Sequence, residues 1–116
     1  MAEWQFEFEW LQIQHKVKDL LGGEKLPDLN GVLFLIGIQE LGQLQENYSK
    51  EEKQNLMHIA VCRLLSEDGY FDFKGIDQDG WPHWEPTRDV DVKGLKNQEV
   101  LLKTKVIEYF LSLIHI

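Results

Sequence analysis

The segment from Leu64 to Pro86 constrains the fold of this chain more than any other part of the sequence, because it combines a helix end, a break and a β-hairpin. Gly69 can close the last turn of a helix in the left-handed conformation. Asp79 and Gly80 suit the two central positions of a type I′ turn, where both residues need positive φ. We therefore expect a hairpin over residues 70–86 that directly follows a helix.

The expected turn also sets the register of the hairpin. It places Ile76 opposite His83 and Gly75 opposite Trp84, and directly opposed residues share a face of the sheet. The face with Phe71, Phe73 and Trp84 is expected to point to the core. The opposite face is expected to form an aromatic patch, of the kind enriched at protein interfaces, unless the N-terminal aromatics or the last helix cover it. The candidate binding residues on that face are Tyr70, Ile76, Trp81, His83 and Glu85.

Apolar residues at helical spacing predict an α+β, predominantly helical fold with about four helices. These are expected near residues 6–21, 28–45, 50–67 and 97–114, with the hairpin between the third and fourth. The best-marked boundary is a capping box, in which Ser49 and Glu52 satisfy each other's backbone amides. The apolar run from Val32 to Ile38 also suits a buried strand, but its continuation to Leu44 favours a helix.

Residues 3–9 carry two conflicting patterns. Trp4, Phe6, Phe8 and Trp10 alternate with polar residues, as in a half-buried strand. Phe6 and Trp10 also begin a spacing of three or four that continues to Leu20, which is typical of an amphipathic helix. The longer pattern favours the helix, and the strand is the alternative.

The last predicted helix is apolar on nearly all sides towards its end. Such a helix either lies across the other helices or forms the seam of a homodimer. The candidate self-association residues are Val106, Phe110 and Leu113. The segment before this helix, residues 89–92, is compatible with a short strand.

Length and composition indicate one globular domain over residues 1–116, since 116 residues suffice to bury a core. The single cysteine, Cys62, excludes an internal disulfide, and the first residues lack the basic and apolar regions of a secretory signal. We therefore expect a cytoplasmic protein. The longest apolar run is far below the roughly 20 residues that span a bilayer, so no membrane association is expected. A net charge of −8 and a pI near 4.9 repel phosphate backbones, so no nucleic-acid partner is expected.

Motifs that carry chemistry are weak in this sequence. Asp77 to Gly80 resembles the core of a calcium loop, but the first and last ligand positions of that loop fall on Gly75 and Pro86. His58 and Cys62 are one helical turn apart and suit two ligands of a transition metal, but no second pair accompanies them. The sequence therefore predicts no metal, no cofactor and no catalytic residues, and no motif supports an enzyme.

The order of elements from residue 28 to residue 114 resembles that of winged-helix regulators, with Gly69-Tyr70-Phe71 as the local motif before a two-stranded wing. The resemblance implies that the third helix enters the major groove of DNA and that the last helix dimerises. However, the wing tip carries Asp77 and Asp79 where basic residues should contact phosphates. A winged-helix fold with these charges would bind protein.

Three functions are therefore open. The preferred one is a non-enzymatic protein-interaction module that uses the hairpin face or the C-terminal helix, with a protein partner or a second copy of the chain. The alternatives are a winged-helix-like regulator, and a small-ligand binder or enzyme with a pocket near Trp81 and His83.

Overall fold

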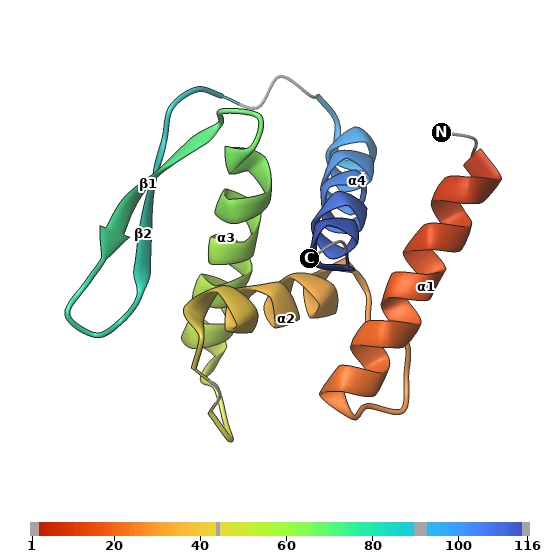
Figure 1. The fold of residues 1–116 in the computed structure, drawn as a ribbon, viewed down its shortest axis with the longest axis horizontal. Coiled ribbons are helices and arrows are strands. Elements are labelled where there is room, and N and C mark those ends of the chain that lie inside the picture. The colour runs from red at the N-terminus through yellow and green to blue at the C-terminus, as the bar shows by residue number, and fades with distance from the viewer. Residues whose placement is uncertain (1–2, 44, 90–92, 115–116) are drawn as a thin grey trace. The chain divides into compact units, whose positions relative to one another are not determined.

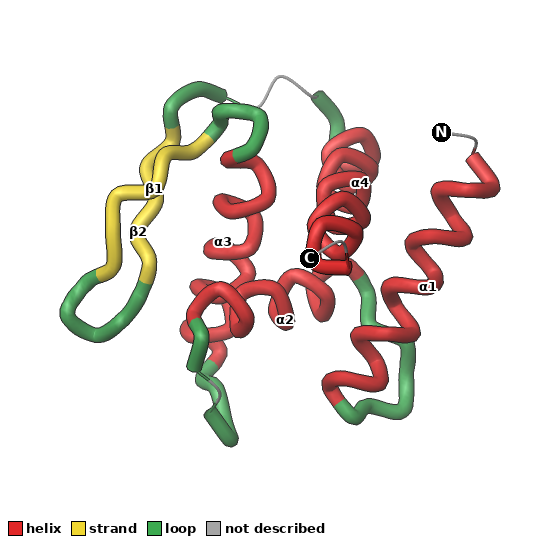
Figure 2. The backbone as a smooth tube through the Cα atoms, in the orientation of Figure 1, coloured by secondary structure: helices red, strands yellow, loops and turns green. Residues whose placement is uncertain are grey.

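The computed structural model describes residues 3–43, 45–89 and 93–114 (Figure 1). These residues form four helices and one antiparallel hairpin, which lies between the third and fourth helix (Figure 2). The α+β, predominantly helical fold class is confirmed. The elements are α1 (Glu3–Leu21), α2 (Leu29–Leu41), α3 (Lys50–Ser66), β1 (Phe71–Ile76), β2 (Pro82–Pro86) and α4 (Leu95–Ile114).

The chain divides into two compact units, Met1–Val32 with Val92–Ile116, and Leu33–Asp91. The expectation of a single domain over residues 1–116 stays a prediction. The strand considered for residues 89–92 falls on 90–92, which lie outside the described residues. No helix in the described part of the chain is both long and apolar enough to cross a bilayer.

The first unit is built on the packing of α1 against α4. Residues 3–9 are helical, so the strand alternative for them is wrong. The helical pattern wins because it continues through Trp10, Ile13 and Val17, which are all buried. On α4 the side chains of Val106, Ile107 and Phe110 are buried as well.

Both ends of the connector after α1 follow from local chemistry. Gly22 has a φ of 74°, which closes the C-terminal end of α1. The side chain of Asp28 accepts a hydrogen bond from the amide of Gly31 at 3.0 Å and so caps the start of α2. Gln14 donates to the carbonyl oxygen of Pro27 at 2.8 Å, which ties the connector back to α1.

The second helix is shorter than the sequence suggests. It ends at Leu41 and not near residue 45, because Gly42 adopts a φ of 75° and its amide bonds to the carbonyl of Ile38 at 3.0 Å. The alternative of a buried strand over Val32 to Ile38 is wrong, since α2 includes this whole run.

In the second unit, α2 crosses α3 at Gly37, where a Cβ atom would lie 2.9 Å from the Cβ of Leu56. Beside this crossing lies a core cluster of Leu41, Leu56 and Ile59, against which four partly buried residues pack: Phe34, Ile38, Tyr48 and Trp81. The capping box that opens α3 is confirmed, with Ser49 Oγ accepting from the amide of Glu52 at 3.1 Å.

The hairpin turn differs from the predicted type I′ turn. The amide of Gly80 bonds to the carbonyl of Asp77 at 3.1 Å, and the amide of Asp77 bonds to the carbonyl of Trp81 at 2.9 Å. Gly80 has a φ of 86°, whereas no non-glycine residue in the described chain has a positive φ. The loop therefore contains three residues. It is a turn whose third loop residue, Gly80, is in the left-handed conformation.

This loop changes the register. Ile76 pairs with Pro82 and Gly75 pairs with His83, so these two residues meet partners one position earlier than predicted, and beyond the bulge the shift is two positions. Phe73 pairs with Trp84, which leaves Lys74 as an extra residue in a β-bulge. Gly75 accommodates the bulge with a φ of 115°.

Candidate functional site

The hairpin is anchored to the end of α3 through its base. Tyr70 is buried, and its carbonyl accepts a hydrogen bond from the amide of Thr87 at 2.9 Å, which joins the two chain segments at the open end of the hairpin. The guanidinium of Arg88 lies 4.1 Å from the ring centroid of Tyr70 and donates to the carbonyl of Asp68 at 2.8 Å. These contacts hold the orientation of both strands beside α3.

The bulge decides which side chains share a face. Because Lys74 is extra, Ile76 lies on the same face as its partner Pro82, and this face also carries Phe73 and Trp84. The ring centroids of Phe73 and Trp84 are 5.2 Å apart. All four side chains line one hollow of about 300 Å³, which we call the hairpin shelf: Phe73, Ile76, Pro82 and Trp84.

The hairpin shelf is apolar and open to solvent. Ile76 is 67% exposed and Phe73 is 52% exposed, although both are large hydrophobic side chains. The prediction that Phe73 faces the core is wrong, because this side chain is exposed on the shelf. Exposed apolar side chains that converge in one hollow are unlike the singly scattered ones of an ordinary surface.

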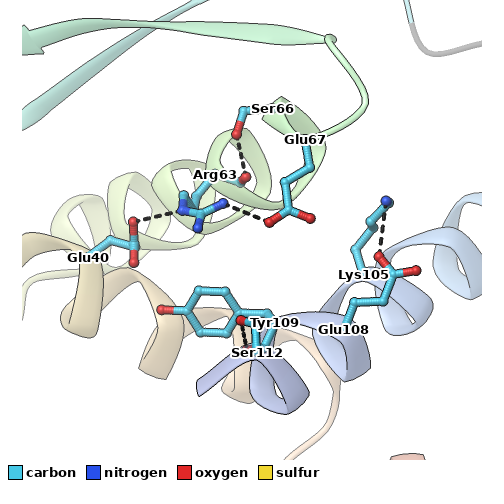
Figure 3. A network of polar contacts seen from close by, with 8 residues as sticks. All are labelled: Glu40, Arg63, Ser66, Glu67, Lys105, Glu108, Tyr109 and Ser112. Carbon is cyan, nitrogen blue, oxygen red and sulfur yellow. Dashed lines mark hydrogen bonds and ion pairs between the residues drawn. The ribbon is translucent and has the colours of Figure 1, made fainter. Parts of the chain in front are cut away.

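An ion pair between α2 and α3 borders the shelf. Arg63 Nε lies 3.4 Å from Glu40 Oε1, and both residues line the same hollow as the four apolar side chains. Arg63 also pairs with Glu67 at 3.3 Å, and Ser66 Oγ donates a hydrogen bond to the backbone carbonyl oxygen of Arg63 at 2.6 Å (Figure 3). The shelf thus has an apolar centre and a charged border.

A second hollow, which we call the polar groove, lies between α3 and the hairpin loop. It measures about 350 Å³ and is lined on its polar side by four residues: Asn55, His58, Asp77 and His83. The apolar lining includes Ile59 of the core cluster, together with Trp81, Pro82 and Trp84 of the hairpin.

Asp77 organises the loop beside this groove. Its Oδ1 accepts hydrogen bonds from the amides of Asp79 at 2.9 Å and Trp81 at 3.0 Å. Its Oδ2 lies 2.8 Å from Nε2 of His83. The His83 hydrogen bond and, after it, the Trp81 amide hold the pKa of the Asp77 carboxyl below its usual range, because both favour the charged form. The carboxylate therefore serves the loop and orients His83.

Cys62 is unsuited to act as a nucleophile. It is fully buried, and this burial raises the pKa of its thiol to about 11. Its Sγ lies 3.5 Å from Nε2 of His58, which confirms that the two residues are one turn apart on α3. Among the described residues, no group of three or more His, Cys, Asp or Glu side chains could hold a metal ion.

The five predicted binding residues do not form one patch. Ile76 lies on the shelf, whereas Trp81 is half-buried against the core cluster and Tyr70 is buried. His83 is exposed at the polar groove, and Glu85 is exposed and pairs with Lys74 at 3.8 Å. The shelf residues that sequence reasoning missed are Phe73, Pro82 and Trp84. Gly75 was the available signal, because a glycine inside a strand often marks a bulge.

The three candidate self-association residues lie on α4. Val106 is fully buried, Phe110 is 6% exposed and Leu113 is half-buried. The role of these residues in a homodimer stays a prediction.

Comparisons with protein-family models, curated proteins and solved structures found no match. The likeness to winged-helix regulators therefore stays a prediction.

Proposed function

We propose that this chain is a non-enzymatic protein-interaction module that binds a partner protein on the hairpin shelf. The observation that carries the proposal is the exposure of Ile76 and Phe73, 67% and 52%, on one face of the hairpin. A pair of large apolar side chains held in one hollow is suited to receive an apolar side chain of a partner, since desolvating such surface is the main favourable term in association.

The border of the shelf supports a protein partner. Specific protein interfaces combine an apolar centre with a polar rim. Here the polar rim is the Glu40–Arg63 ion pair, which lines the shelf beside its apolar side chains. The partner that fits is a protein segment with a large apolar side chain at its centre and polar groups around it. The single cysteine supports a cytoplasmic setting for this interaction.

The experiment compares three forms of the chain in an affinity enrichment followed by titration of the purified partner. The first form is wild type, and the second carries Phe73→Ala and Ile76→Ala. The third is the matched control Leu95→Ala, which truncates an 87% exposed leucine outside the shelf. We expect the shelf variant to weaken the affinity at least about tenfold, or about 1.4 kcal/mol, and the control to leave it unchanged.

Folding is checked by circular dichroism, and the exposed positions make loss of the fold unexpected. If partners bind the shelf variant and wild type equally, the shelf is not the docking surface and the proposal is wrong.

A second candidate function rests on the polar groove. His83 and Asp77, 2.8 Å apart, line a hollow of about 350 Å³, a volume in the range of small-ligand sites. A ligand screen would then raise the melting temperature of wild type by mass action, and His83→Ala would remove the effect. If the screen finds no such ligand and a partner protein binds in a way that depends on the shelf, the interaction module is the function.

A further inference from the structure

Helix α1 has two apolar faces, and only one of them is used in packing. Trp10, Ile13 and Val17 form the buried face. On another side of the helix, Trp4 is 73% exposed and Phe8 is 54% exposed, and Leu11 continues the row at 43%. These three side chains, spaced by four and three residues, form what we call the outer stripe: Trp4, Phe8 and Leu11.

The outer stripe explains the two conflicting patterns in the first residues. In a helix, the alternation of Trp4, Phe6, Phe8 and Trp10 cannot stay on one face, because each step of two residues turns the chain by about 200°. Phe6 and Trp10 turn towards the packed side and are half-buried and buried. The other two aromatics are left outside with no role in the core.

The outer stripe has a negative border. It lines a hollow of about 860 Å³ together with Glu3, Glu7, Trp10 and Gln14. Glu3 and Glu7 are exposed and lie one turn apart. No basic residue in the described chain lines this hollow. The stripe spans about 10 Å of helix, which is the length over which a helix in a groove places its apolar anchors.

One of the rings in this hollow already receives a cation from within the chain. Lys103 of α4 places its Nζ 5.2 Å from the ring centroid of Trp10. Indole faces attract ammonium groups, and Trp4 presents a second indole that is far more exposed. Aromatic rings beside carboxylates therefore favour a partner with lysine or arginine next to its apolar side chains.

We propose that the outer stripe of α1 is a second docking surface, and that its occupant is a basic amphipathic helix of a partner protein. The apolar side of that helix covers the stripe, and its lysines or arginines face Glu3 and Glu7. A second copy of the chain is disfavoured because it would bring the same carboxylates together, with a net charge of −8 on each copy. An anionic membrane surface is disfavoured by the same charges.

The test uses a synthetic amphipathic helical peptide of leucine and lysine, labelled for fluorescence anisotropy, and a counterpart with glutamate in place of every lysine. We expect the lysine peptide to bind wild type with an affinity that falls as salt rises, because the carboxylates contribute. We expect the glutamate peptide to bind at least about tenfold more weakly, which corresponds to about 1.4 kcal/mol.

Two variants and one control assign the binding to the outer stripe. Trp4→Ala with Phe8→Ala removes the apolar centre, and Glu3→Lys with Glu7→Lys reverses the border; each is expected to weaken lysine-peptide binding at least about tenfold. The charge-reversed variant is also expected to bind the glutamate peptide more tightly than wild type does. Leu20→Ala, at a 62% exposed position on the same helix but outside the hollow, is expected to leave the affinity unchanged.

Several results would overturn the proposal. The proposal is wrong if wild type does not bind the lysine peptide, or if the Trp4→Ala, Phe8→Ala variant binds it as tightly as wild type does. Uptake on phosphatidylcholine vesicles that depends on Trp4 and Phe8 would assign the stripe to a membrane. A dimer in light scattering that the same substitutions dissociate would assign it to a second copy. Circular dichroism of each variant separates loss of binding from loss of the fold.

Discussion

Substitution of Gly37 by alanine is expected to destabilise the protein, although it improves the helix in which the residue lies. Gly37 is buried in the middle of α2, where α2 crosses α3. An added Cβ would lie 2.6 Å from the carbonyl carbon of Leu56 and 2.9 Å from its Cβ, and closer still to its carbonyl oxygen. These atoms belong to the backbone of α3 or are fixed to it, so no change of rotamer relieves the overlap.

The magnitude follows from two opposing terms. Alanine is favoured over glycine in a helix interior by about 1 kcal/mol. Ordinary contacts of a Cβ begin at 3.4 Å, so the two helices must separate by several tenths of an ångström or more. Overpacking of a buried contact costs about 1–3 kcal/mol, and a gap of 0.5–1 Å also removes about a quarter to a half of the dispersion energy of the contacts around it. We expect a net loss of about 1–2 kcal/mol in the free energy of unfolding.

Urea unfolding followed by far-UV circular dichroism measures this loss. The matched control is Gln39→Ala, an exposed position on the same helix, where only helix propensity changes. The free energy of unfolding of this control is expected to lie within about 0.5 kcal/mol of the wild-type value. Gly23→Ala is a second control, because its Cβ would meet no atom closer than 3.9 Å.

The reasoning is refuted if Gly37→Ala is as stable as wild type or more stable, with an unchanged dependence on urea. In that case α2 and α3 do not approach each other at this residue.

Three further predictions concern single side chains. Because the folded pKa of Asp77 is depressed, its carboxylate contributes stability that is fully present above its ordinary pKa of 3.8 and is lost as the pH falls through the lower folded value. Asp77→Asn should therefore lower the urea midpoint at neutral pH, and the midpoint of the variant should fall less than that of wild type below pH 3.8. An unchanged acid dependence would contradict the role given to the His83 contact. With a thiol pKa raised from 9.0 to about 11, Cys62 should react with a disulfide reagent at least about a hundredfold more slowly in the folded protein than in denaturant, and equal rates would show that it is accessible. Ser49→Ala removes the side-chain oxygen of the capping box and should cost about 1 kcal/mol in urea unfolding, whereas Ser112→Ala, which removes only a bond to the helix's own carbonyl at 2.7 Å, should cost less.

The sequence by itself determined the number, type and order of the elements. Helical periodicity is a local property with a physical cause, since one stripe must be buried, and it located α1, α3 and α4 to within a few residues. The start of α3 was predicted to the residue because Ser49 and Glu52 satisfy amides that any helix start leaves free. The position of the hairpin followed from its glycines and aromatic residues in the same way.

The tertiary structure decided the register of the hairpin and therefore the candidate site. Asp79 and Gly80 suit a two-residue loop and a three-residue loop alike, because both loops end on a residue with positive φ, which is Gly80 in either case. The longer loop is accompanied by a local contact, the capping of the loop by Asp77, and by a tertiary one, the packing of Trp81 against the core cluster. With the bulge at Lys74, this choice moved Ile76 to the face of Phe73 and Trp84 and created the hairpin shelf.

Tertiary structure also decided which apolar residues stay outside. The pattern of α1 contains more aromatic residues than one buried stripe can hold. The helical spacing already indicated the face of Trp10, and the packing of α1 against α4 covered that face and left Trp4 and Phe8 exposed. Gly37 shows the same dependence, since its lack of a side chain matters only because Leu56 lies against it. Local sequence specifies elements because their hydrogen bonds and periodicity are local, whereas faces and surfaces depend on contacts between residues far apart in the chain.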